Sequence, residues 1–222
     1  MTFKFLTGPQ ILIEIVYLLI IIISCLVVYL KTRQIYQLSL HKGIKYFRNA
    51  FLFFGIAYLS RFALSFTHFL IKGPFNNFYS QLGFFVFIYA GTMAALSFIS
   101  SFLWKKWKWF DSPILLHIIA LVIGLSAFLH ATYMYIFLVG LSILFLGGVA
   151  LSAFKYKEAK RKKKFPHLYI AYSLLFITWV ANTAAYAVGG DSLITIIILY
   201  TVSTLFFLFI LYRVIKKINK GH

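Results

Sequence analysis

The chain has 222 residues, of which 62% are hydrophobic and only 12% are charged. Soluble domains are about 45–50% apolar and about 25% charged, so this composition excludes a soluble globular domain, a disordered chain and a nucleic-acid-binding domain. The formal net charge of +18 therefore has to be explained by where the cations lie.

Seven apolar stretches follow one another along the chain. Each is about 20 residues long, which is the length that a helix needs to cross the hydrocarbon core of a membrane. The stretches cover residues 10–30, 49–71, 83–104, 113–129, 135–154, 166–188 and 192–214. They predict an all-α membrane protein with a single polytopic domain, a bundle of seven transmembrane helices. The fourth and fifth stretches are separated only by residues 130–134, which is enough for a tight helical hairpin.

The cations lie almost entirely on one side of these predicted spans. Segments 31–48, 105–112 and 155–165 and the residues after 212 carry all but three of the 22 Lys and Arg residues. An excess of Lys and Arg marks the cytoplasmic side of a membrane protein. The sequence therefore predicts a multi-pass protein of the cell membrane with its N-terminus outside and its C-terminus in the cytoplasm. This placement accounts for the net charge without nucleic acid.

One basic run is denser than orientation requires. It lies after the fifth predicted span and consists of Lys155, Lys157, Lys160, Arg161, Lys162, Lys163 and Lys164. Such a run binds anionic lipid headgroups in other membrane proteins, and it could equally dock an acidic region of a cytoplasmic protein. The expected partners are thus the lipid bilayer, its anionic lipids and a cytoplasmic protein, with no nucleic acid.

Polar residues form a stripe along the second predicted span. Tyr58, Arg61, Ser65 and His68 are spaced i, i+3, i+7 and i+10, so they share one face of a helix. Ionisable residues inside a span are costly and mark candidate functional sites. Glu14 is the only carboxylate within any span. We expect it to be the counter-charge of Arg61, directly or through His68.

A second stripe runs along the sixth predicted span. Trp179, Asn182, Thr183 and Tyr186 are spaced i, i+3, i+4 and i+7, and Tyr17 lies one turn after Glu14. Together the two stripes predict an aromatic-walled polar pocket in the outer half of the bundle, as is typical of a small-ligand site. Interhelical polar contacts also serve packing alone, so a purely structural role stays open.

Motifs of enzyme chemistry are missing from the sequence. It contains no zinc-protease, serine-hydrolase or phosphate-binding-loop pattern, and its four acids are Glu14, Asp111, Glu158 and Asp191. Asp111 and Asp191 precede predicted helices and are expected to cap them. The sequence predicts no enzyme, no catalytic residue, no metal site and no cofactor. The remaining cofactor option is a haem held by His68 and His130, since bis-histidine ligation needs two residues at one depth.

Small residues are concentrated in the fifth predicted span. Gly140, Gly147, Gly148 and Ser152 recur at helical spacing, and small residues let neighbouring helices approach closely. We expect this span to be the tightly packed helix of the bundle.

These observations favour a non-enzymatic membrane module of receptor or sensor type. Its binding site would be the polar pocket around Glu14, Arg61 and His68, and its output would pass through the basic inner segments. A small-solute or proton-coupled transporter using the same residues is the alternative. A structural or assembly protein is the third possibility.

Overall fold

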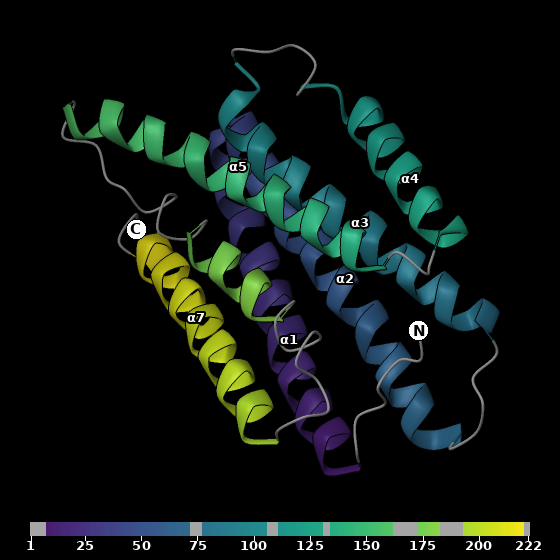
Figure 1. Cartoon of the computed structure of the whole chain (residues 1–222). Coiled ribbons are helices and arrows are strands. Elements are labelled where there is room, and N and C mark those ends of the chain that lie inside the picture. The colour runs from purple at the N-terminus through teal and green to yellow at the C-terminus, as the bar shows by residue number, and fades with distance from the viewer. Residues whose placement is uncertain are drawn as a thin grey trace.

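The structure is a computed structural model, and it describes residues 8–71, 77–105, 111–130, 134–161, 173–182 and 193–219. Those residues form seven helices, in agreement with the number predicted (Figure 1). Six of them are α1 (Gly8–Ser39), α2 (Lys42–Ile71), α3 (Asn77–Leu103), α4 (Pro113–Leu129), α5 (Met134–Arg161) and α7 (Leu193–Asn219). The seventh is the short helical segment Ser173–Asn182 between α5 and α7. The predicted break between the fourth and fifth helices is thereby confirmed.

Four of these helices, α1, α2, α3 and α7, are long and apolar enough to cross a membrane. The apolar parts of α4, α5 and segment Ser173–Asn182 are shorter, at 10–17 residues within the described chain. The fold is therefore that of an all-helical protein consistent with insertion in a membrane. Seven complete spans and the outward N-terminus stay predictions.

Several helices extend beyond the apolar stretches that predicted them. The basic segment 31–48, expected as a connection, is helical except at Leu40 and His41. Helix α5 continues to Arg161 because Lys, Glu, Ala and Arg are good helix formers even where hydrocarbon ends. Helix α1 has 32 residues, a length of about 48 Å, against about 30 Å for the hydrocarbon core.

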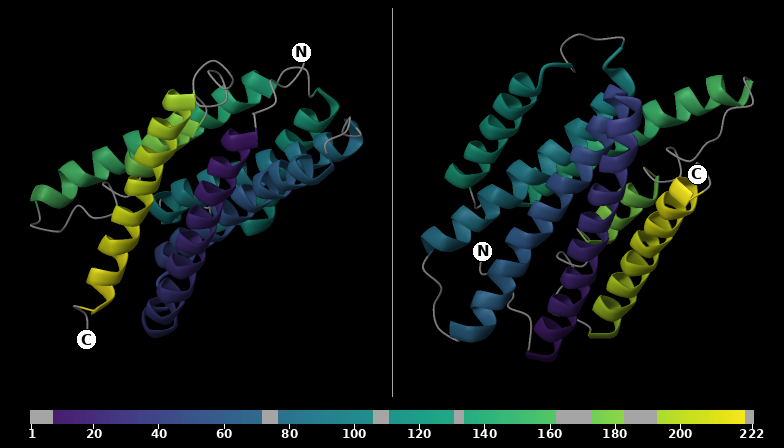
Figure 2. Two further views of the ribbon diagram at one scale, coloured as in Figure 1. Left: turned by 90° about the horizontal axis from the view of Figure 1, so that it is seen from below. Right: turned by 180° about the vertical axis from the view of Figure 1, so that it is seen from behind.

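The turn between α1 and α2 is only two residues long. Leu40 has a positive φ of 49°, and its N–H donates to the carbonyl of Tyr36 at 2.8 Å, while His41 O accepts from the N–H of Ile44 at 2.9 Å. This left-handed residue closes α1 as glycine commonly does at a helix end. The two helices leave the turn as an antiparallel hairpin (Figure 2).

Helix α3 is the most buried of the four long helices. It packs against α2, α4 and α5, and α1 lies between α2 and α7. Helix α4 lies at the edge of the bundle, against α3 (Figures 1 and 2). The core is rich in aromatic rings, and the largest fully buried ones include Phe51, Phe54, Phe98 and Phe207.

The glycine prediction was wrong, because the closest glycine contacts of the described residues lie on α2, α3 and α4, whereas Gly148 of α5 is only in ordinary contact with Ile99. A Cβ on Gly140 or Gly147 would meet no atom within 4 Å. By contrast, a Cβ on Gly91 of α3 would lie 2.7 Å from Leu141 Cδ2, and one on Gly124 of α4 would lie 3.0 Å from the ring of Phe85. Small residues permit a close approach, but sequence spacing does not show which neighbour makes it.

Alanine substitutions distinguish these two kinds of glycine. We expect Gly91→Ala to lower the free energy of unfolding by about 1–3 kcal/mol, because Leu141 is itself buried and an overfilled core must shift. Gly147→Ala adds a methyl group in open space and is expected to be neutral or to stabilise α5 by up to about 1 kcal/mol. Unfolding of both variants in detergent checks this, and equal effects would contradict the placement of α3.

Candidate functional site: a buried polar cluster

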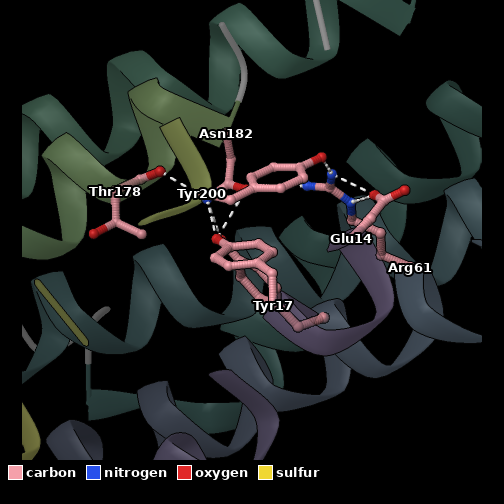
Figure 3. Close-up of polar contacts among 7 residues, drawn as sticks. Glu14, Tyr17, Arg61, Thr178, Asn182 and Tyr200 are labelled. Atoms are coloured by element: carbon pink, nitrogen blue, oxygen red, sulfur yellow. Dashed lines mark hydrogen bonds and ion pairs between the residues drawn. The ribbon is translucent and has the colours of Figure 1, made fainter. Parts of the chain in front are cut away.

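An ion pair joins α1 to α2 inside the bundle. Arg61 Nε donates to Glu14 Oε1 at 2.7 Å, and Arg61 Nη2 lies 2.5 Å from the same oxygen. The two side chains are only 3% and 4% exposed. Charges buried this deeply are tolerated only when they are paired and hydrogen-bonded. Figure 3 shows the pair with its neighbours.

The guanidinium of Arg61 has further acceptors on two other helical elements. Its Nη1 donates to Asn182 Oδ1 at 3.1 Å, and its Nη2 donates to the hydroxyl of Tyr200 at 2.7 Å. The planar fork of an arginine can serve several acceptors at once. Arg61 therefore connects α1, α2, segment Ser173–Asn182 and α7 through one side chain (Figure 3).

Asn182 is the second centre of the cluster. Its Nδ2 lies within hydrogen-bond distance of the hydroxyls of Tyr17 (2.7 Å) and Tyr58 (2.8 Å) and of the Thr178 carbonyl (2.8 Å). The hydroxyl of Tyr17 also lies 2.9 Å from Oδ1 and can donate to it. An amide has two N–H groups, so these three acceptors share them. Asn182 is 5% exposed, and its amide is fully used.

Aromatic rings surround these polar groups. The rings of Tyr17 and Tyr200 are stacked, with centroids 4.5 Å apart and an interplanar angle of 3°, and Tyr58 meets Tyr17 edge-on at 6.2 Å. The polar cluster is defined here as Glu14, Tyr17, Tyr58, Arg61, Asn182 and Tyr200. Its members are all at most 5% exposed, so their hydrogen bonds act in a medium of low polarity.

Trp179 lies beside the cluster and faces the aromatic core. Its ring stacks on Phe87 at 5.5 Å and on Phe145 at 5.3 Å. Its indole N–H donates to Ser142 Oγ on α5 at 3.1 Å. Trp179 therefore ties segment Ser173–Asn182 to α3 and α5, and it holds Asn182, three residues further on, against α1 and α2.

The cluster lies towards the end of the bundle where α1 and α7 begin. Glu14 is six residues after the start of α1, and Tyr200 is seven residues after the start of α7. At 1.5 Å per residue, both lie about 10 Å from their helix starts. The sequence-based orientation assigns this end to the outer side of the membrane.

The other predicted site residues do not all join the cluster. Ser65 is half-buried one turn after Arg61 and makes no hydrogen bond to the cluster within the described chain. His68 belongs to α2, but its side chain is outside the described residues, as are Thr183 and Tyr186. His130, the second histidine of the predicted haem option, lies just after α4, where its Nδ1 is 3.3 Å from the Ser126 carbonyl.

The basic run predicted to bind lipid is only partly described. Lys155, Lys157, Lys160 and Arg161 lie in α5, with side chains outside the description, and Lys162, Lys163 and Lys164 fall outside it altogether. Among the described residues, no group of three or more His, Cys, Asp and Glu side chains lies close enough to hold a metal ion. The lipid prediction for this run stays a prediction.

Tyr200 is the cluster residue that sequence reasoning missed. It begins a stripe with Ser203, Phe207 and Ile210, spaced i, i+3, i+7 and i+10, and all four are buried. The periodicity that indicated the stripes of the second and sixth spans is thus present in the seventh as well. No sequence pattern indicates Ser142 as the partner of the Trp179 indole, because a lone serine in an apolar helix usually bonds to its own backbone.

At the opposite end of the bundle, Asp111 has a different role from the one predicted. The residue that caps α4 is Ser112, and it makes no side-chain cap bond. Asp111 instead accepts from Lys42 Nζ at 2.6 Å and from the Tyr46 hydroxyl at 3.3 Å. The hydrogen bond from Lys42 lowers the pKa of the Asp111 carboxyl below its ordinary value. Asp111 thus binds a residue 69 positions away in the sequence and does not cap α4.

This ion pair predicts a weak acid sensitivity. Because the folded pKa of Asp111 is depressed, the pair stabilises the fold above the unfolded pKa of about 3.9, and this contribution disappears as the pH falls through the folded value. We expect wild type to unfold at a higher temperature than Asp111→Asn at neutral pH, and the difference to vanish well below pH 4. A difference independent of pH would show that the carboxylate charge is not involved.

The described chain is all-helical, and its apolar helices are consistent with a membrane protein. Comparison with known proteins adds one relative. The chain is similar to an uncharacterized protein of Archaeoglobus fulgidus, with 29% identity over 213 residues, which covers 92% of each chain. No family model matches the chain, and no solved structure matches it. The similarity thus extends over nearly the whole chain but brings no activity with it.

Proposed function

We propose that this chain is a non-enzymatic membrane module of receptor or sensor type, with the polar cluster as the element that responds. The observation that carries the proposal is the Glu14–Arg61 pair, which is almost fully buried and bonded to Asn182 and Tyr200. Apolar residues of similar size often stabilise a core as well as a buried ion pair does. Ionisable groups kept inside an apolar bundle therefore suggest a function.

The connections of Arg61 suggest how such an element would respond. Three of its acceptors lie on three different helical elements, namely α1, segment Ser173–Asn182 and α7. Protonation of Glu14, or an anionic group competing for Arg61, would weaken several interhelical bonds at once. A change of local charge can shift a two-state arrangement of helices in this way.

The site is closed in this structure, which bears on the type of ligand. The guanidinium and the Asn182 amide are already bonded to protein groups, so a ligand has to replace one of these partners. A small molecule with a carboxylate or a similar acceptor can replace Glu14 or Tyr200 on the guanidinium fork. The aromatic walls formed by Tyr17, Tyr58 and Tyr200 suit a partly apolar ligand.

A transporter coupled to a small solute or to protons is the alternative, and the same observation favours it. Glu14 is the only acid of the predicted spans, and it is bonded to Arg61, which also binds acceptors on two other helical elements. Such a pair can exchange a proton for a substrate group as its helices move.

Two measurements on the protein purified in mild detergent test the proposal. Native mass spectrometry with an optical spectrum should detect a bound small molecule, with higher occupancy in Tyr200→Phe, because this change removes a hydroxyl that competes with the ligand for Arg61. Thr204→Val is the matched control, because among the described residues the Thr204 hydroxyl donates only to the Tyr200 carbonyl in its own helix. Substrate flux into liposomes without stable binding would favour the transporter. If the protein shows no ligand binding and no flux, the cluster has a structural role.

A further inference from the structure

The end of the bundle where α1 joins α2 carries cations that rest on aromatic rings. Lys42 and Lys105 lie 5.8 and 5.1 Å from the ring centroid of Trp104. On α7, Arg213 lies 5.0 Å from Phe209 and Lys216 lies 5.3 Å from Tyr212. Such pairs are usual at a membrane interface, where Lys and Arg side chains and aromatic rings meet the headgroups.

Arg48 has a more specific setting than these cations. Its guanidinium carbon lies 5.2 Å from the ring centroid of Tyr29 and 5.1 Å from that of Tyr36, so two rings of α1 hold a side chain of α2. The Nε of Arg48 is buried and has no hydrogen-bond partner among the described groups. A buried guanidinium N–H without an acceptor is costly, so this N–H leaves room for an acceptor that is not among the described residues.

Arg33 lies at the same level of the hairpin. Residues 29, 33 and 36 are spaced i, i+4 and i+7, so Arg33 shares one face of α1 with both tyrosines. Because the hairpin turns at Leu40 and His41, position 33 of α1 is level with position 48 of α2. The Arg33 side chain is exposed, and the two arginines therefore flank the tyrosine pair from facing helices.

The acids described in the structure do not neutralise these two arginines. Asp111 is bonded to Lys42 and Tyr46. Glu14 is bonded to Arg61 and precedes Arg33 by 19 residues of α1, which is about 28 Å. Two like charges held at one level without a neighbouring acid favour the binding of an anion.

The depth of this site matches the headgroup region of a bilayer. The apolar span of α1 begins at Gln10. Tyr29 lies 19 residues further along the helix, which is about 28 Å. The hydrocarbon core is about 30 Å thick. If α1 crosses the membrane, Tyr29 therefore lies at its edge, and Arg33, Tyr36 and Arg48 lie among the headgroups.

We propose that Arg33 and Arg48, with Tyr29 and Tyr36, bind the phosphate of an anionic membrane lipid. Guanidinium groups pair with phosphate through two parallel hydrogen bonds, and the rings hold one of the two forks in place. A lipid is favoured over free phosphate because the site lies between two helices at headgroup depth. The inference does not depend on the polar cluster, and the site is separate from the basic run of α5.

Native mass spectrometry in mild detergent with added phosphatidylglycerol tests this site. Each arginine near an anionic headgroup contributes about 1 kcal/mol, so Arg33→Gln should weaken binding roughly fivefold and Arg33→Gln/Arg48→Gln roughly 25-fold. Arg213→Gln/Lys216→Gln is the matched control, because it removes two ring-bound cations from α7. We expect that control to keep the wild-type affinity, and phosphatidylcholine to bind wild type less tightly than phosphatidylglycerol.

Three results would overturn the proposal. Equal losses in the two double variants would indicate general attraction by charge. Unchanged affinity in Arg33→Gln would exclude the site even if the double variant did not fold, because the exposed Arg33 side chain can be replaced without disturbing the core. Displacement of phosphatidylglycerol by inorganic phosphate at equal concentration would assign the site to free phosphate.

Discussion

Arg61→Leu is expected to destabilise the protein more than the double change Glu14→Gln/Arg61→Leu. The single change leaves the Glu14 carboxylate buried without its cation and removes the donors to Asn182 and Tyr200. Breaking a buried pair from one side costs about 3–5 kcal/mol. The double change removes both charges, so a large part of this penalty disappears although the polar cluster is still incomplete.

Unfolding of wild type, both single variants and the double variant in detergent measures this coupling. The double-mutant cycle is expected to give an interaction free energy on the order of 2 kcal/mol between Glu14 and Arg61. Additive effects would contradict a pairing between the two side chains. A control cycle between Arg61 and Ser65 should be additive, because Ser65 makes no hydrogen bond to the cluster within the described chain.

Asn182→Leu should produce the second large effect. The substitution keeps the size of the side chain roughly constant but removes the amide that lies against Tyr17, Tyr58, Arg61 and the Thr178 carbonyl. Each polar group left buried without a partner costs about 1–3 kcal/mol, although interhelical bonds in membranes average less. We expect a loss of roughly 2–4 kcal/mol in the free energy of unfolding.

Thr178→Val is the matched control for this substitution. Thr178 lies one turn before Asn182 and is fully buried. Within the part of the chain that the structure describes, its hydroxyl donates only to the Leu174 carbonyl of its own helix. Its replacement should therefore cost less than about 1 kcal/mol. Similar losses in the two variants would mean that Asn182 is merely a buried side chain and does not connect the helices.

The number of helices and the centre of the polar cluster could be predicted because strong physical constraints act on them. Apolar length determines where helices form, and an ionisable residue in an apolar helix is so costly that few candidates exist. Glu14 and Arg61 were conspicuous for that reason, and the structure places them in contact. Asn182 followed from helical spacing, although its four partners did not.

The misses arose where a contact depends on packing between distant parts of the chain. Tyr200 is one of 15 tyrosines, so its type alone carries little information. Asp111 looked like a helix cap, but Lys42 offers a stronger partner than a local N–H does. Gly91 and Gly147 look alike in the sequence, and only the position of Leu141 makes one of them tightly packed.

The two-residue turn at Leu40 and His41 has a mechanical consequence. Without a flexible linker, α1 and α2 form one stiff unit that extends from the Glu14–Arg61 pair to the tyrosine-held Arg48. The distance along α1 from Glu14 to Tyr36 is about 33 Å. A small tilt of this unit at one end would therefore be carried, as in a lever, to the far end of the hairpin. Events at one end of the hairpin would reach the other end without any change within the helices.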